Sequence, residues 1–164
     1  MNSELFRLFL PVGAGVLLGL VAAFRGFLRA WREAPDAPGF VRLLAGLAAA
    51  APLTKLFYAA ILAFVAAAPA PNAGEPVFQR VGVFLVAGNV MGLMAFAQGI
   101  VAAARMPKML AASSKEAQQD FANRFLGPSG KPGAIPVTLM IQGFFETPAL
   151  FAMIGGIIAL QMTN

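Results

Sequence analysis

Four long apolar runs dominate this sequence, at about residues 6–31, 41–68, 78–104 and 136–162. Each run reaches the roughly 20 residues that an α-helix needs to cross the hydrocarbon core of a bilayer. None of the runs alternates between apolar and polar residues as a strand of a membrane barrel would. Because only helices and closed barrels satisfy all their backbone hydrogen bonds in lipid, the sequence predicts an all-α membrane protein with four transmembrane helices.

Composition supports the same class and excludes several others. The chain has 164 residues, of which 59% are hydrophobic and 12% are charged, whereas a soluble domain is roughly 45–50% apolar and about 25% charged. It contains no Cys and no His, so disulfides, a catalytic Ser-His-Asp triad and a His proton relay are excluded. The net charge of +5 comes largely from short loops between apolar runs, so we expect no nucleic-acid partner.

The distribution of Lys and Arg predicts the orientation in the membrane. The connection at 32–41 is flanked by Arg residues, and the one at 105–136 carries five basic residues, whereas Arg80 and Arg7 stand nearly alone in the middle connection and the N-terminal segment. Basic residues favour the cytoplasmic side. We therefore expect loops 32–41 and 105–136 in the cytoplasm and both termini on the opposite side of a bacterial plasma membrane.

A repeat divides the chain into two hairpins in tandem. Shifting the sequence by 73 residues places Gly15 on Gly88, Gly19 on Gly92 and Arg32 on Arg105. The first hairpin then covers residues 1–72, and the second covers residues 73–164. Gly-x3-Gly pairs allow close approach of helix backbones in a membrane. Such pairs are also common in ordinary membrane packing, but their recurrence at matching places predicts that the first and third helices form a tight inner layer.

Glu146 is the one charge in the apolar run at 141–160. An ionisable residue inside a membrane marks a candidate functional site. Counting about 1.5 Å per helical residue places Gln98 at a similar depth. Together with the hydroxyl of Thr147, these side chains offer oxygen atoms to a small cation, or hydrogen bonds to a protonated acid. Gln142, one turn before Glu146, is expected to face the same site.

Two basic residues could modify this site. Lys55 lies in the middle of the second apolar run, where it could pair with Glu146 or extend toward an interface. Arg25 lies near the cytoplasmic end of the first run, where extension of its guanidinium to the interface is the simpler interpretation. A purely structural ion pair of Glu146 with Lys55 or Arg25 stays an alternative.

The segments "GNVMGLMAFAQGIVAAARMP" and "GFFETPALF", with the two-hairpin organisation, resemble the rotor-ring proteolipid (subunit K or c) of V-type ATPases and V/A-type ATP synthases. The resemblance implies that Glu146 carries a proton or a sodium ion. It further implies that Gln98 contributes to a sodium site with Glu146, and that Thr54 belongs to the ion site. Lys55 stands where sodium-binding members have Gln, which favours the proton and an ionised Glu146.

The same resemblance implies a mechanism and a set of partners. Identical copies would form a membrane rotor ring that turns against a stator subunit carrying an essential arginine, and the cytoplasmic loops would contact a central-stalk subunit. Ion flow would be coupled to ATP hydrolysis or synthesis elsewhere in the complex. This chain would perform no covalent chemistry and would need no cofactor besides the transported H+ or Na+.

Two other functions are compatible with the residues. The first is a small ion or solute transporter in which Glu146, Lys55 and Arg25 form a polar pathway within one chain. The second is a structural membrane subunit whose charges are simply paired. A rotor must form a closed ring of many copies, whereas these alternatives need only monomers or small oligomers.

Overall fold

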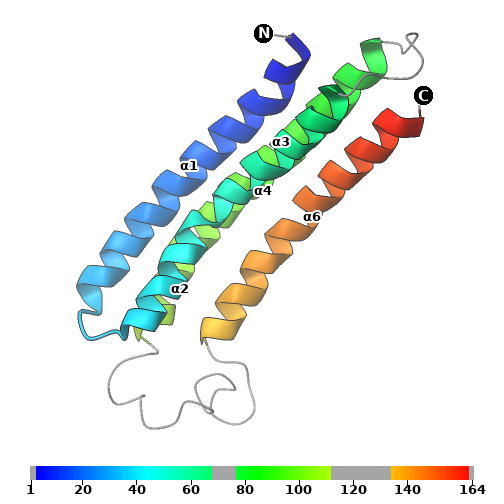
Figure 1. Ribbon diagram of the computed structural model, residues 1–164. Helices are drawn as coiled ribbons and strands as arrows, with labels where there is room; N and C mark the ends of the chain where they lie inside the picture. Colours follow the sequence, from blue (N-terminus) through cyan, green and yellow to red (C-terminus); the bar gives the residue numbers. More distant parts are fainter. Residues whose placement is uncertain (1–2, 68–76, 112–133, 163–164) are drawn as a thin grey trace.

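The computed structural model describes residues 3–67, 77–111 and 134–162, and all regular structure in these ranges is helical (Figure 1). The elements are α1 (Ser3–Glu33), α2 (Gly39–Ala50), the 3₁₀ turn η1 (Ala51–Leu53), α3 (Thr54–Ala67), α4 (Val77–Ala111) and α6 (Ala134–Met162). In this described part, four helical segments are long and apolar enough to cross a membrane: Leu5–Glu33, Gly39–Ala67, Arg80–Ala111 and Ala134–Met162. The predicted all-helical class with four such helices is confirmed, and it supports an integral membrane protein.

The third helix is longer than the sequence indicates. Its apolar run was expected to end near residue 104, but α4 continues to Ala111, so the first residues of the expected loop at 105–136 are helical. Met106, Met109 and Leu110 are fully buried against the ends of α1 and α2. Tertiary packing therefore extends the helix beyond its most apolar part. Residues 112–133 of the expected loop, and the middle connection at 68–76, lie outside the described residues.

The second span is one path through the membrane built from two helices. Between α2 and α3 the chain makes the 3₁₀ turn η1, which contains Pro52. Proline has no N–H to donate, and its ring collides with the carbonyl of the residue four positions earlier. The α-helical pattern is therefore interrupted at Pro52. This interruption lies directly before Thr54 and Lys55, so it sets how these two side chains enter the bundle.

Helices α1 and α4 pack closely and run in the same direction. A Cβ atom built on Gly15 would lie 2.0 Å from the carbonyl oxygen of Gly92, and one on Gly99 would lie 2.1 Å from that of Gly19. A Cβ on Gly88 would lie 2.8 Å from the carbonyl oxygen of Leu8. No side chain fits at these distances, so the glycines allow the two backbones to touch. Gly15, Gly19, Gly88 and Gly92 all lie at this contact between α1 and α4.

The other spans surround this pair. Helix α6 packs against α4 and α3, and in Figure 1 the start of α1 and the end of α6 lie at the same end of the molecule. Much of the outer surface is apolar, with Phe64, Phe144 and Phe151 among its most exposed large side chains. Such a surface suits lipid or other membrane-embedded protein.

Substituting Gly15 by Ala should destabilise the protein by about 1–3 kcal/mol or more, because the new methyl group overlaps the backbone of Gly92. The matched control is Gly13→Ala in the same helix, where a Cβ meets nothing within 4 Å. Thermal unfolding of both variants in detergent measures the difference. Equal stability of the two variants would contradict the close packing of α1 on α4.

Candidate functional site

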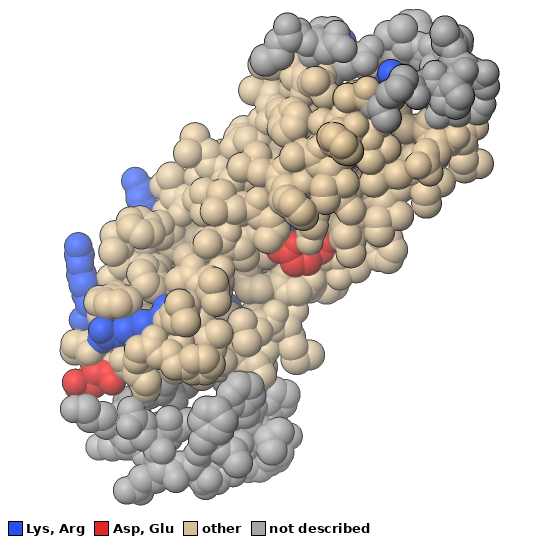
Figure 2. Space-filling view, in the orientation of Figure 1, with Lys and Arg blue, Asp and Glu red and all other residues tan. Residues whose placement is uncertain are grey.

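The candidate site lies where α3, α4 and α6 meet. Glu146 is the thirteenth residue of α6, so it lies roughly 18 Å along the helix axis from the start of that helix. This is near the middle of a hydrocarbon core about 30 Å thick. Figure 2 shows one acidic surface in the middle of a largely uncharged face, whereas most of the basic side chains and a second acidic surface lie toward the end of the molecule where α1 ends.

The ammonium group of Lys55 is surrounded by oxygen atoms from three helices. Its Nζ lies 2.5 Å from Glu146 Oε1 on α6, 2.5 Å from Gln98 Oε1 on α4 and 3.1 Å from Thr54 Oγ1 on α3. An ammonium group has three N–H donors and no acceptor. The three oxygens therefore match the three donors of a charged Lys55, whose side chain is 0% exposed.

The carboxylate of Glu146 receives hydrogen bonds from the same helices. Gln98 Nε2 donates to Glu146 Oε1 over 2.9 Å, and Thr54 Oγ1 lies 3.0 Å from both carboxylate oxygens. Because a hydroxyl has one proton, Thr54 donates to one of these oxygens at a time or to the carbonyl of Ala51, 2.8 Å away. With 27% of its side chain exposed, Glu146 is the charged member of the cluster that is accessible from the surface.

Gln98 orders the cluster through both ends of its amide. Its oxygen accepts from Lys55, and its nitrogen donates to Glu146 and, over 3.3 Å, to the backbone carbonyl of Gln142. Only one orientation of the amide satisfies both charged neighbours, since the oxygen must face the ammonium and the NH2 must face the carboxylate. Gln98 is fully buried, so it holds the ion pair at a fixed depth.

The structure brings together four of the side chains singled out in the sequence: Glu146, Gln98, Thr54 and Lys55. It does not bring Thr147 into the cluster, because Thr147 is exposed and its hydroxyl donates to the carbonyl of Gly143 in its own helix, over 3.3 Å. Neighbouring residues of an α-helix point about 100° apart, so Thr147 faces away when Glu146 faces inward.

Gln142 takes part in the site through its backbone and not through its side chain, whereas Arg25 lies at the surface, in agreement with the simpler interpretation of its position. Gln142 is 6% exposed and offers its backbone carbonyl to Gln98, but its side-chain amide has no hydrogen-bond partner among the described residues. Arg25 is exposed and lines a surface hollow with Arg29, Arg32 and Glu33 at the end of α1. The ion pair that Glu146 makes is therefore with Lys55, and Arg25 is not its partner.

Tyr58 belongs near the site although the sequence analysis does not single it out. It lies close enough to Glu146 to interact with its carboxylate. The signal in the sequence was its spacing: Tyr58 follows Thr54 by four residues, which places both side chains on one face of α3.

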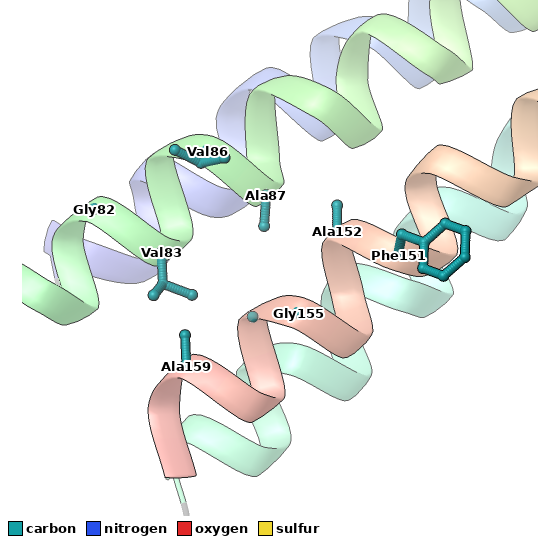
Figure 3. Close-up of a pocket in the computed structure, with 9 residues that line it drawn as sticks. Gly82, Val83, Val86, Ala87, Phe151, Ala152, Gly155 and Ala159 are labelled. Atoms are coloured by element: carbon teal, nitrogen blue, oxygen red, sulfur yellow. The ribbon is translucent and has the colours of Figure 1, made fainter. Parts of the chain in front are cut away.

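An apolar groove lies beside the polar cluster and is separate from it. The groove runs between α4 and α6 and has a volume of about 430 Å³; Figure 3 shows side chains of both helices along it. Its residues are Gly82, Val83, Val86, Ala87, Phe151, Ala152, Gly155, Gly156 and Ala159. Among the described residues, its lining has no charged or polar side chain.

The chemistry available at the cluster is the binding of one cation or one proton. Among residues 3–67, 77–111 and 134–162, no three His, Cys, Asp or Glu side chains come together, so this part of the chain does not form the ligand set of a transition-metal site. One carboxylate with an ammonium, an amide and a hydroxyl instead resembles a site that exchanges a single charge.

No family model matches this chain, and neither does any curated protein. The resemblance to rotor-ring proteolipids therefore stays a prediction, which rests on the residues quoted above.

Replacing one member of the ion pair should destabilise the protein more than replacing both. Lys55→Met and Glu146→Gln each leave one charge without its partner inside the bundle, which costs about 3–5 kcal/mol. The double variant leaves neither charge, so its loss should be clearly smaller than the sum of the two single losses. Thermal unfolding of the four proteins gives the coupling energy, and strict additivity would show that the pair does not form.

Proposed function

We propose that this chain is the ion-carrying rotor-ring subunit of a V/A-type rotary ATPase, in which Glu146 translocates H+ or Na+. The single observation that carries the proposal is the position of Glu146. It is the one acidic side chain in the middle of a described membrane span, and it is held by side chains from two other helices and is partly open to the surface. An ion carrier needs this combination, because its carboxylate must be held by the protein and must also be accessible from the protein surface.

The close pair of α1 and α4 supports the ring arrangement. In the proposed assembly the chain is two tandem hairpins, and these two glycine-rich helices form the inner layer. The inner layer of such a ring has a small circumference, so its helices must pack closely. The glycine contacts allow this close packing. The outer layer consists of the second and fourth spans, and α6 carries Glu146 on this layer.

The carrying step follows from the cost of charge in lipid. A bare carboxylate at the centre of a bilayer costs at least about 2.5–3.5 kcal/mol. Glu146 must therefore be neutralised while its copy passes through lipid, and it gives up its cargo next to the essential arginine of the stator subunit. Each loaded copy permits rotation in one sense, and this couples ion flow to ATP hydrolysis or synthesis in the soluble part of the complex.

The proposed setting is a bacterial plasma membrane, with the end of α1 and the end of α4 on the cytoplasmic side. Basic residues of the described spans gather at that end: Arg25, Arg29, Arg32, Arg42, Arg105 and Lys108. This pattern agrees with the positive-inside tendency. A central-stalk subunit would contact the ring on the same side.

A structural membrane subunit is the second candidate. The observation that favours it is the direct contact of Lys55 with Glu146, because a paired charge needs no transported ion to be neutral. The two candidates differ in whether Glu146 is needed for ion-coupled activity.

Glu146→Gln should abolish ion-coupled ATPase activity in complexes that assemble with the wild-type subunit composition, because an amide can accept hydrogen bonds but cannot exchange a proton or balance a cation. Coupled activity is measured as ATP-driven ion uptake into vesicles, and composition is measured by native mass spectrometry. The control is Asn89→Leu in α4, which removes an exposed polar side chain that hydrogen-bonds within its own helix. Coupled uptake that persists in Glu146→Gln would reject the proposal.

A further inference from the structure

The ammonium of Lys55 lies among the oxygen atoms of the cluster. Small hard cations take oxygen ligands at about 2.0–2.6 Å from several directions. The nitrogen of Lys55 lies 2.5, 2.5 and 3.1 Å from oxygens on three helices. The side chain of Lys55 is fully buried, so its ammonium is enclosed by the protein.

We infer that Lys55 is the specificity-determining residue of this site: its ammonium takes the position of a metal cation, so the cluster excludes sodium and the transported ion is a proton. The inference rests on the proposed function, and it decides between the two ions that the proposed function leaves open. The observation behind it is the enclosure of one nitrogen by Glu146, Gln98 and the hydroxyl of Thr54.

Electrostatics and ligand supply both act against sodium. Two unit positive charges about 4 Å apart, at an effective dielectric constant of about 20, repel enough to lower occupancy roughly a thousandfold. Gln98 Oε1 and Glu146 Oε1 are already used by the ammonium. The remaining oxygen of Glu146 is 3.0 Å from the hydroxyl of Thr54, and one carboxylate oxygen with one hydroxyl is a poor ligand set for a metal ion in competition with a fixed charge.

The charge of the cluster is compatible with a proton as cargo. With Lys55 charged and Glu146 ionised, the pair is net neutral, as is needed for passage through lipid. In this state the exchangeable proton is on Lys55 Nζ: its loss leaves a neutral amine beside the ionised Glu146, with one net negative charge, and its return restores the neutral pair, so no other ion enters the balance. The groups that face Glu146 are Lys55, Thr54 and Tyr58 on α3 and Gln98 on α4, and among these Lys55 alone brings a positive charge.

The test is direct binding of radioactive sodium to the full-length protein in lipid vesicles, with choline chloride holding the ionic strength constant. Wild type should show no saturable sodium binding. Lys55→Gln removes the charge and adds an amide oxygen, so it should bind one sodium ion per chain. At a free sodium concentration about ten times the dissociation constant, this binding raises occupancy of the site to roughly nine-tenths.

Two further variants make each result interpretable. Lys55→Gln combined with Glu146→Gln should lose the sodium site, which assigns the binding to this cluster. Lys55→Met removes the charge without adding a ligand, so it should bind sodium more weakly than Lys55→Gln. Thermal unfolding shows whether both variants are folded.

Saturable sodium binding by wild type that disappears in Glu146→Gln would overturn the inference while leaving Glu146 as an ion carrier. Absence of sodium binding in folded Lys55→Gln and folded Lys55→Met would also overturn it, because the charge would then not be what excludes the metal. Failure of the proposed function is a different result, namely coupled uptake that persists in Glu146→Gln.

Discussion

The contact between Lys55 and Glu146 is the interaction on which the rest of the site depends, because each charge would be expensive in the bilayer without the other. It joins the second span to the fourth. Gln98 then joins the third span to the same point, since its amide faces the ammonium with its oxygen and the carboxylate with its nitrogen. Three helices are thus held in one register by a cluster of four polar side chains in an apolar bundle.

The position of this cluster depends on two local features of the backbone. The interruption of the second span at Pro52 allows the adjacent residues Thr54 and Lys55 both to contribute to the site. The glycine contacts between α1 and α4 bring these two backbones together. Helix α4 carries Gln98, so the same close packing that shapes the bundle also fixes one wall of the polar cluster.

Much of this arrangement is predictable from the sequence. Lengths of apolar runs predict four helices, matching glycines predict the contact of α1 with α4, and the rise per residue predicts that Gln98 lies at the depth of Glu146. The four-helix organisation and the similar depth of Gln98 and Glu146 therefore follow from spacing in the sequence alone. The number of copies in an assembly does not, since spacing within one chain contains no direct information about neighbours.

The sequence does not predict which face of the fourth helix turns toward the bundle. Its surface is apolar nearly all round, so periodicity gives little indication of which face turns inward. Thr147 was therefore grouped with Glu146 although it faces outward, and Tyr58 was overlooked although its spacing from Thr54 was available. The length of α4 was underestimated because the burial of Met106, Met109 and Leu110 depends on tertiary contacts.

In the proposed rotor ring, many copies of this chain surround one axis with Glu146 on the outer helices. Electron cryomicroscopy of the purified protein in lipid nanodiscs tests this most directly, since it reveals both the number of copies and the side on which α6 lies. We expect one closed ring of many copies, with α1 and α4 lining the inside and Glu146 toward the lipid. A monomer, or a small oligomer in which Glu146 faces a central axis, would contradict it.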